Sequence, residues 1–189
     1  MKKIISVIVS GVLITSLFTN FAAAQQGNDF SYSGKNAGKS FLPQIAELTP
    51  VPDNTSGTSK ADLKLMKANM KAAKAELKAT TNFNRVYKNA PDVKWVVEEK
   101  ALVGFFNQDD KRSMVAYNKK GNWMYTIVNY SADKLSATTR NMIQEAFKHF
   151  KITLVQEISQ GDVTVLEIHL QLEDEYKNIL VYEGEIINL

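Results

Sequence analysis

The sequence predicts an α+β fold: an antiparallel sheet with helices packed on one face, preceded by a lysine-rich helix. From residue 80 onward, apolar runs with the alternating pattern of strands follow one another, separated by short turns. Two isolated helical segments accompany them, and meandering strands with few helices are typical of a sheet covered by helices on one face. The chain contains no cysteine, which excludes a disulfide framework, a thiolate metal site and a cysteine nucleophile.

Residues 1–24 have the pattern of a cleaved signal peptide. Lys2 and Lys3 precede an apolar run over 4–18, and Ala22-Ala23-Ala24 supplies the small residues that a signal peptidase needs. The alternative, a membrane anchor, normally needs about 20 continuous apolar residues, and this run is shorter. We therefore expect a mature chain that begins at Gln25 and is periplasmic or secreted, and the lack of cysteine excludes a lipid-anchored start.

The expected mature chain is close to neutral. Removal of 24 of the 189 residues leaves 165, about one domain. It also removes two lysines and no acidic residue, so the net charge falls from +3 to +1. A balance this close to zero gives no support to a nucleic-acid partner.

Residues 25–59 are predicted to form a flexible linker. Glycine, serine and asparagine are frequent, Pro43, Pro50 and Pro52 interrupt the segment, and no apolar periodicity runs through it. The segment also contains apolar side chains that could instead dock on the domain surface: Phe30, Tyr32, Phe41, Leu42, Ile45 and Leu48.

Residues 60–79 are predicted to form an amphipathic helix with Ser59 as its N-cap. One stripe of this helix is apolar: Leu63, Met66, Met70, Ala73 and Leu77. A second stripe, roughly a quarter-turn away, is basic: Lys60, Lys64, Lys67, Lys71, Lys74 and Lys78. The helix is either a basic arm for anionic lipid or an acidic partner, or it packs on its own domain. The narrow stripe without Trp or Phe favours packing, so membrane contact through Lys60–Lys78 is open but not favoured.

Residues 80–189 are predicted to form the α+β domain. Thr81 is expected to cap a short helix that ends before Pro91, and four strand-like runs follow between 93 and 130. A second helix is expected from Ser131 or Asp133 to about His149. The remaining strands are predicted over 152–158, 164–172 and 178–183. The middle one alternates, so Glu167 and His169 are expected on a wet face.

The residues that could support catalysis or metal binding are few. The two histidines, His149 and His169, do not form a spaced ligand pair. The acidic turns lack the ligand pattern of a calcium loop. Trp95 alternates with valines and is interpreted as a core residue. We therefore expect no catalytic residues, no metal and no cofactor.

Three aromatic residues of one hairpin are the candidate protein-contact site. The loop over 118–122 pairs Tyr117 with Trp123 and places Tyr125 opposite Val115, which would put the three aromatic residues on one face. The other face would hold Met114, Ala116, Met124, Thr126 and Val128. If helices cover that second face, Tyr117, Trp123 and Tyr125 are exposed and suited to protein recognition, whereas the opposite orientation makes them core.

Several segments resemble the PepSY-like family of exported bacterial proteins, which is related in fold to the β-lactamase-inhibitor proteins. They are Ala90-Pro91-Asp92-Val93-Lys94-Trp95, the strand pair from Ala116 to Trp123, the helix around Leu135, and Val181-Tyr182-Glu183-Gly184-Glu185-Ile186-Ile187. The resemblance covers about residues 80–189. Family members commonly have Asp-Gly in the last turn, where this chain has Glu183-Gly184.

The resemblance implies a domain that binds or restrains other proteins outside the cytoplasm, and it brings no catalytic residues. We therefore expect an exported, non-catalytic protein-binding or inhibitory module whose partner is an unknown extracytoplasmic protein. Two alternatives remain. One is a small-ligand carrier or hydrolase that uses the concavity of the sheet. The other is an envelope-associated structural protein that uses the lysine-rich helix.

Overall fold

The structure of the chain, a computed structural model, describes residues 59–88, 90 and 92–188. The predicted signal peptide at 1–24, the expected start at Gln25 and the predicted linker, apart from Ser59, lie outside the described residues.

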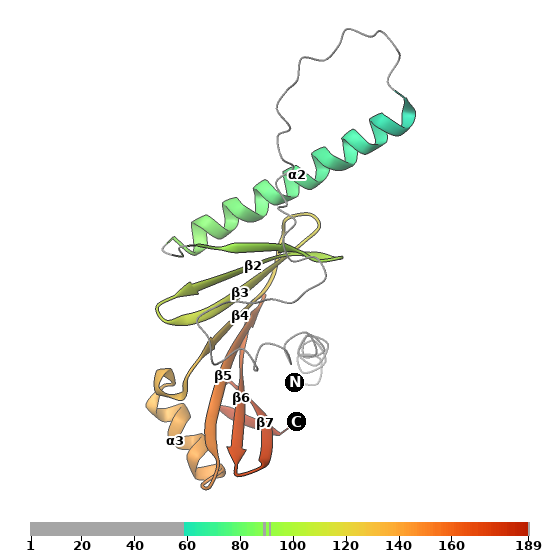
Figure 1. Ribbon diagram of the computed structural model, residues 1–189. Helices are drawn as coiled ribbons and strands as arrows, with labels where there is room; N and C mark the ends of the chain where they lie inside the picture. The colour runs from blue at the N-terminus through green and yellow to red at the C-terminus, as the bar shows by residue number, and fades with distance from the viewer. Residues whose placement is uncertain (1–58, 89, 91, 189) are drawn as a thin grey trace. The chain divides into compact units, whose positions relative to one another are not determined.

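The described residues contain one antiparallel sheet of eight strands, which lie side by side in the order of the sequence (Figure 1). The strands are β1 (Lys94–Val97), β2 (Ala101–Gln108), β3 (Lys111–Asn118), β4 (Trp123–Tyr130), β5 (Lys151–Gln160), β6 (Val163–Leu172), β7 (Glu175–Tyr182) and β8 (Glu185–Asn188). Short turns connect all of them except β4 and β5, which are joined through a helical segment. The predicted α+β class with an antiparallel sheet is confirmed.

The helix that precedes the sheet is longer than predicted. α2 runs without a break from Lys60 to Val86. Ser59 is its N-cap, as predicted: its side chain accepts a hydrogen bond from the Ala61 backbone, and Asp62 completes a capping box. The prediction of a second helix capped by Thr81 is wrong, because Thr81 lies within α2, where neither glycine nor proline interrupts the helix.

The second helical segment is shorter than predicted and is divided. A 3-10 turn, η3 (Ala132–Lys134), precedes α3 (Ala137–Ala146). The N-cap of α3 is Ser136, whose side chain accepts a hydrogen bond from the backbone N–H of Thr139 at 3.1 Å. The helix therefore begins later than the predicted start at Ser131 or Asp133, and it ends before His149.

Both helices pack on the same face of the sheet. Thr126, Val128 and Tyr130 alternate along β4, so their side chains share one face. Thr126 is hydrogen-bonded to Tyr87, the C-cap residue of α2, at 2.8 Å between the two hydroxyl oxygens. Val128 and Tyr130 belong to the same apolar cluster as Ile143 of α3. We call this the helix-covered face and the opposite one the helix-free face.

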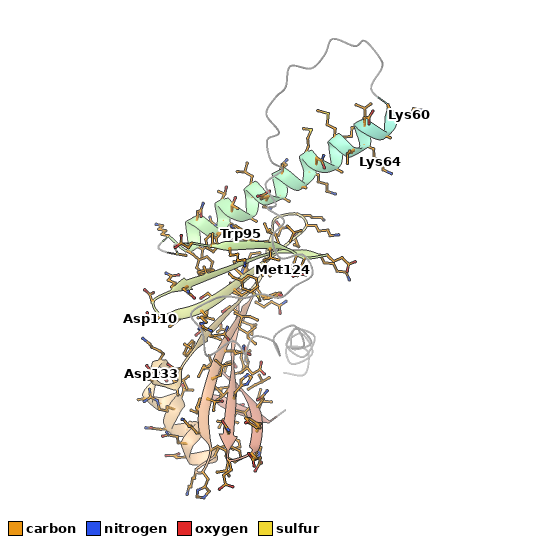
Figure 2. All side chains as sticks on the ribbon, in the orientation of Figure 1. Lys60, Lys64, Trp95, Asp110, Met124 and Asp133 are labelled. Carbon is orange, nitrogen blue, oxygen red and sulfur yellow. The ribbon has the colours of Figure 1, made fainter. Side chains whose placement is uncertain are left out.

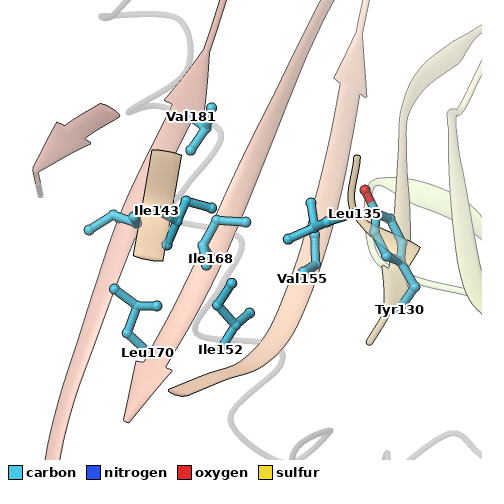
Figure 3. Packing of buried hydrophobic residues seen from close by; sticks show 9 residues of the cluster. Tyr130, Leu135, Ile143, Ile152, Val155, Ile168, Leu170 and Val181 are labelled. Carbon is cyan, nitrogen blue, oxygen red and sulfur yellow. The ribbon is translucent and has the colours of Figure 1, made fainter. Parts of the chain in front are cut away.

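Two apolar clusters fill the helix-covered face. The cluster under α2 is rich in aromatic side chains, and its buried members are Ala79, Phe83, Leu102, Phe106, Val115 and Tyr117. Phe83 lies at its centre, with ring centroids 5.0 Å from Phe106 and 5.3 Å from Trp95. Trp95 is therefore part of the core, as predicted. The cluster under α3 is mostly aliphatic (Figure 3): Tyr130, Leu135, Ile143, Ile152, Val155, Ile168, Leu170, Ile179 and Val181.

Candidate binding surfaces

The three aromatic residues of the hairpin do not form an exposed face. Tyr117 is fully buried under α2, and its hydroxyl donates a hydrogen bond to Asn82 Oδ1 at 3.0 Å. Trp123 is half-buried on the same face, where its indole N–H donates to Thr126 Oγ1 at 3.0 Å. Tyr125 is half-buried on the helix-free face. The prediction that the three share a solvent-facing surface is therefore wrong.

A bulge in β4 separates Tyr125 from the other two. Tyr117 pairs with Trp123, as predicted, but the next residue of β3, Ala116, pairs with Tyr125, so Met124 is an extra residue on β4. Val115 pairs with Thr126 rather than with Tyr125. The orientation of β3 is also opposite to the one that an exposed aromatic face requires. Val115 lies under α2, whereas Ala116 lies on the helix-free face.

α2 contacts the sheet through small residues near its C-terminal end. Ala79 and Phe83 are the buried residues of the helix. Gly121, in the β3–β4 turn with φ of +73°, approaches the helix backbone so closely that a Cβ atom there would clash with the carbonyl oxygen of Ala75. Alanine on the helix and glycine on the turn permit this close approach, because neither places a bulky side chain between the two backbones.

The stripe of larger apolar residues on α2 is exposed. We define the Leu/Met stripe as Leu63, Met66, Met70 and Leu77, whose exposed fractions are 45%, 60%, 64% and 68%. Every residue from Lys60 to Lys74 is exposed, and Figure 2 shows Lys60 and Lys64 at the end of α2 that lies away from Trp95. The expectation that this stripe packs on the domain is wrong. At about 100° per residue, it lies nearly half a turn from the line of Ala75, Ala79 and Phe83 that faces the sheet.

The helix-free face also contains buried apolar side chains. Seven of them belong to neither of the two clusters: Val96, Val103, Met114, Ala116, Ile127, Val165 and Leu180. Cross-strand neighbours connect most of them, since Val96 pairs with Val103, Val103 with Ala116, and Met114 with Ile127. They form a nearly continuous apolar surface from β1 to β7.

A row of buried polar side chains crosses this surface. Asn129 of β4, Gln156 of β5 and Glu167 of β6 occupy paired positions, and each is at most 8% exposed. Gln156 Nε2 donates to Asn129 Oδ1 at 2.7 Å, and Asn178 Nδ2 donates to Glu167 Oε1 at 3.4 Å. The prediction that Glu167 lies on a solvent-exposed face of β6 is therefore wrong, because Glu167 is only 2% exposed.

The carboxylate of Glu167 is incompletely satisfied. Its Oε1 lies 3.7 Å from Nε2 of His169, beyond hydrogen-bond distance. Among the residues that the structure describes, neither Glu167 Oε2 nor His169 Nε2 has a hydrogen-bond partner, and both atoms are buried. Burial raises the pKa of Glu167 and lowers the pKa of His169, because it disfavours the charged form of each. Sequence reasoning missed this pair because strand alternation alone does not show whether a second face is covered.

Neither a metal-binding cluster nor a membrane-spanning helix occurs in the described part of the chain. Its histidine, aspartate and glutamate side chains form no group of three that could hold a metal ion. None of its helices is long and apolar enough to cross a membrane.

No family model and no curated protein matches the chain. Its fold is similar to solved structures. A BLIP-like protein from Bacteroides fragilis superposes with a TM-score of 0.53 at 14% identity, over 59% of this chain and 82% of that one. A DUF2874 family protein from Bacteroides ovatus gives a TM-score of 0.51 at 16% identity, over 59% of this chain and 85% of that one. A predicted periplasmic protein from Bacteroides eggerthii superposes with a TM-score of 0.51 at 14% identity, over 59% of this chain and 84% of that one. At these identities the similarity shows the fold alone, which is BLIP-like.

Proposed function

We propose that the chain is an exported, non-catalytic binding module that docks another protein on the Leu/Met stripe of α2. The observation that carries this proposal is the exposure of four large apolar side chains, 45–68% each, along one line of a helix that packs on the sheet only near its C-terminal end, through Ala79 and Phe83. Exposed large apolar side chains that are contiguous, rather than scattered, mark interaction sites in soluble proteins.

The chemistry of the stripe favours a protein groove as its partner. Apolar residues three and four positions apart are the anchors with which a helix fits into an apolar groove. Methionine, which supplies two of the four side chains, adapts to irregular partner surfaces. Lysines follow one side of the stripe, whereas Asp62, Asn69 and Glu76 follow the other. The partner groove should therefore have an acidic rim on the side that meets the lysines.

A lipid surface and a second copy of this chain fit the stripe less well. Asp62 and Glu76 would face an anionic membrane, and the stripe has no Trp or Phe to anchor it there. A parallel pair of α2 helices would bring Asp62 near Lys67 of the other copy, which is favourable. However, the small side chain of Ala73 would leave the contact between the helices poorly filled, and the stripe covers fewer than three heptads, which is short for a coiled coil.

The pattern of residues 1–24 supports export, and the fold similarity to a predicted periplasmic protein agrees with it. Membership of the PepSY-like family and an inhibitory mode of action are parts of the same proposal, supported by the resemblance over residues 80–189. The mature protein should begin at Gln25, which the intact mass of the exported protein checks. A mass that retains residues 1–24 would contradict it.

The binding surface is tested with two charge substitutions on the same exposed part of α2. Met70→Glu places a charge within the stripe, whereas Ala68→Glu places the same charge on an exposed position outside it. Both variants should unfold within about 0.5 kcal/mol of the wild type, because surface changes of this kind have small effects. The mature variants, with a photo-crosslinker at Leu77, are used to capture partners from envelope extract.

Crosslinking to a partner protein that survives Ala68→Glu and is lost with Met70→Glu supports the proposal. Lys67→Glu should also weaken capture if the rim of the partner groove is acidic, and that weakening should shrink at high salt. Crosslinking only between copies of the chain, or binding only to vesicles rich in anionic lipid, would overturn it.

A further inference from the structure

β1 is an edge strand whose outer backbone groups point away from the sheet. Among the described strands, its one neighbour is β2. The backbone N–H of Glu98 donates to the carbonyl oxygen of Ala101 at 2.8 Å, so these two residues form a hydrogen-bonded pair at the turn between β1 and β2. Such pairs alternate along an antiparallel ladder. Val96 is therefore hydrogen-bonded to β2, whereas the N–H and C=O groups of Trp95 and Val97 face outward and are available to another strand.

β1 lacks the usual protection of an edge strand. Natural sheets protect an edge with proline, with a bulge or with several charged side chains. β1 has no proline, pairs with β2 in a regular register and has one charged residue, Lys94. Val97 is 39% exposed. The edge is therefore suited to pairing with a further strand.

The charges at the two ends of this edge indicate which strand it fits. Lys94 begins β1 and Glu98 follows its last residue, and both side chains are exposed. The two residues are four positions apart, so they lie on the same face of the strand. An antiparallel copy of the same segment reverses their order and places opposite charges beside each other, which is a favourable cross-strand contact.

We propose that β1 pairs with β1 of a second copy of this chain, antiparallel and about a two-fold axis at Val96. This register places Trp95 of each copy opposite Val97 of the other, so that their outward N–H and C=O groups bond to each other. It also places Lys94 of each copy opposite Glu98 of the other. The two-fold axis repeats each contact, so the interface contains two pairs of opposite charge.

The neighbouring registers are unfavourable. Outward backbone groups recur at every second residue, so the register changes in steps of two residues. A step in one direction would bring Asp92 opposite Glu98, and a step in the other would bring Lys94 opposite Lys100. Like charges directly opposite each other are destabilising. The backbone and the charges therefore favour the same register.

β8, at the other edge of the sheet, does not offer this contact. Glu185 is the one charged residue of this strand, so a second copy of β8 would meet no opposite charge in it. A pairing of β1 with β8 would be head-to-tail, which leaves a free edge on each copy and continues into a filament unless it closes a ring. A pair of β1 strands instead closes with two copies.

Sedimentation velocity of the mature chain over a range of concentrations tests the proposal. A contact of about five residues from each copy is small, so we expect a dimer at about 100 μM that dissociates on dilution to about 1 μM. Lys94→Glu and Glu98→Lys should each give a monomer at about 100 μM, because each substitution brings like charges together twice. Lys120→Glu, on the exposed β3–β4 turn, is the control and should dimerise as the wild type does.

A mixture of the two monomeric variants gives the sharpest result. In a mixed dimer of Lys94→Glu with Glu98→Lys, every contact again joins opposite charges, so the dimer should return at equal concentrations of the two. A wild type that stays monomeric at about 300 μM would overturn the proposal. A dimer that persists in either single variant, a mixture that stays monomeric, or filaments in place of a dimer would overturn it as well.

A disulfide gives a second measurement that does not depend on the charges. Because the chain has no cysteine, Val96→Cys gives a single thiol, which the two-fold axis places opposite its own copy at about 4.5 Å between Cα atoms, close enough for a disulfide. Val103→Cys, on the same face of β2, is the control. Under mild oxidation, Val96→Cys should form a covalent dimer about tenfold faster or more, and equal rates would contradict the pairing. This contact does not involve the Leu/Met stripe, so a monomeric result would leave the proposed binding surface on α2 unaffected.

Discussion

The two faces of the sheet bury their side chains in different ways. Under α2 and α3, apolar and aromatic side chains pack in clusters that the helices close, and the buried hydroxyl of Thr126 is hydrogen-bonded to Tyr87. On the helix-free face, buried aliphatic side chains surround a polar row, and one oxygen of Glu167 has no partner among the described residues. Helices therefore close the first face, whereas neither of the described helices packs on the second.

The largest expected effect lies on the helix-covered face. Phe83→Ala should lower the free energy of unfolding by about 3–5 kcal/mol, because Phe83 is 1% exposed and contacts the rings of Tyr87, Trp95 and Phe106. Urea unfolding measures the loss. Leu77→Ala, on the exposed side of the same helix, is the control and should change stability by less than about 0.5 kcal/mol. Similar losses for both variants would show that α2 does not pack through Phe83.

The next effect tests how closely α2 approaches the β3–β4 turn. Gly121→Ala should cost more than Gly161→Ala. Both glycines have positive φ, which alone costs about 1–2 kcal/mol for alanine. The new Cβ at position 121 would meet the Ala75 carbonyl, whereas nothing lies within 4 Å at position 161. The additional loss at 121 should be about 1–3 kcal/mol, measured by thermal or urea unfolding, and equal losses would contradict the close contact.

The smallest effect belongs to the helix-free face and depends on pH. Burial raises the pKa of Glu167 above its ordinary value, so the contribution of this group to stability is fully present below the unfolded pKa and is lost as pH rises through the folded pKa. Glu167→Gln removes that loss and keeps an oxygen for Asn178. The free energy of unfolding of the variant, relative to that of the wild type, should therefore rise by about 1 kcal/mol as the pH increases from 4 to 7.

Urea unfolding at several pH values measures this gain, and Glu145→Gln on the exposed side of α3 corrects for the change in net charge. A stability difference that stays constant with pH would show that Glu167 is not buried as an isolated carboxyl group.

The sheet was predictable because its pattern is local. Alternating apolar residues and short turns define each strand, and strands joined by tight turns pair with their neighbours in the sequence. The N-cap at Ser59 was also predictable, since the cap and Asp62 form a local motif. The boundary at Thr81 was not. A threonine inside a helix resembles a cap until the contacts of Phe83 show that the helix continues into the core.

The candidate site depended on features that have no local signature. Nothing in the sequence marks Met124 as the extra residue of a bulge, yet that one residue moves Tyr125 to the opposite face from Trp123. The side of α2 that packs on the sheet is the one with the small residues Ala75 and Ala79. It is not the side with the larger apolar stripe that the periodicity indicates. Glu167 was missed for a related reason, because burial on both faces does not alter the alternation of a strand.

The strand order has a consequence for the speed of folding. Because each strand pairs with the next one along the chain, most pairings close a short stretch of polypeptide, and a short closure has a small entropic cost. The contacts that join α2 to the sheet are also modest in sequence separation, since Asn82 and Tyr117 are 35 residues apart. β1 and β8 lie at opposite edges and need never meet, so assembly can proceed hairpin by hairpin from either end. We therefore expect faster folding than for a sheet of equal size whose edge strands must first find distant partners.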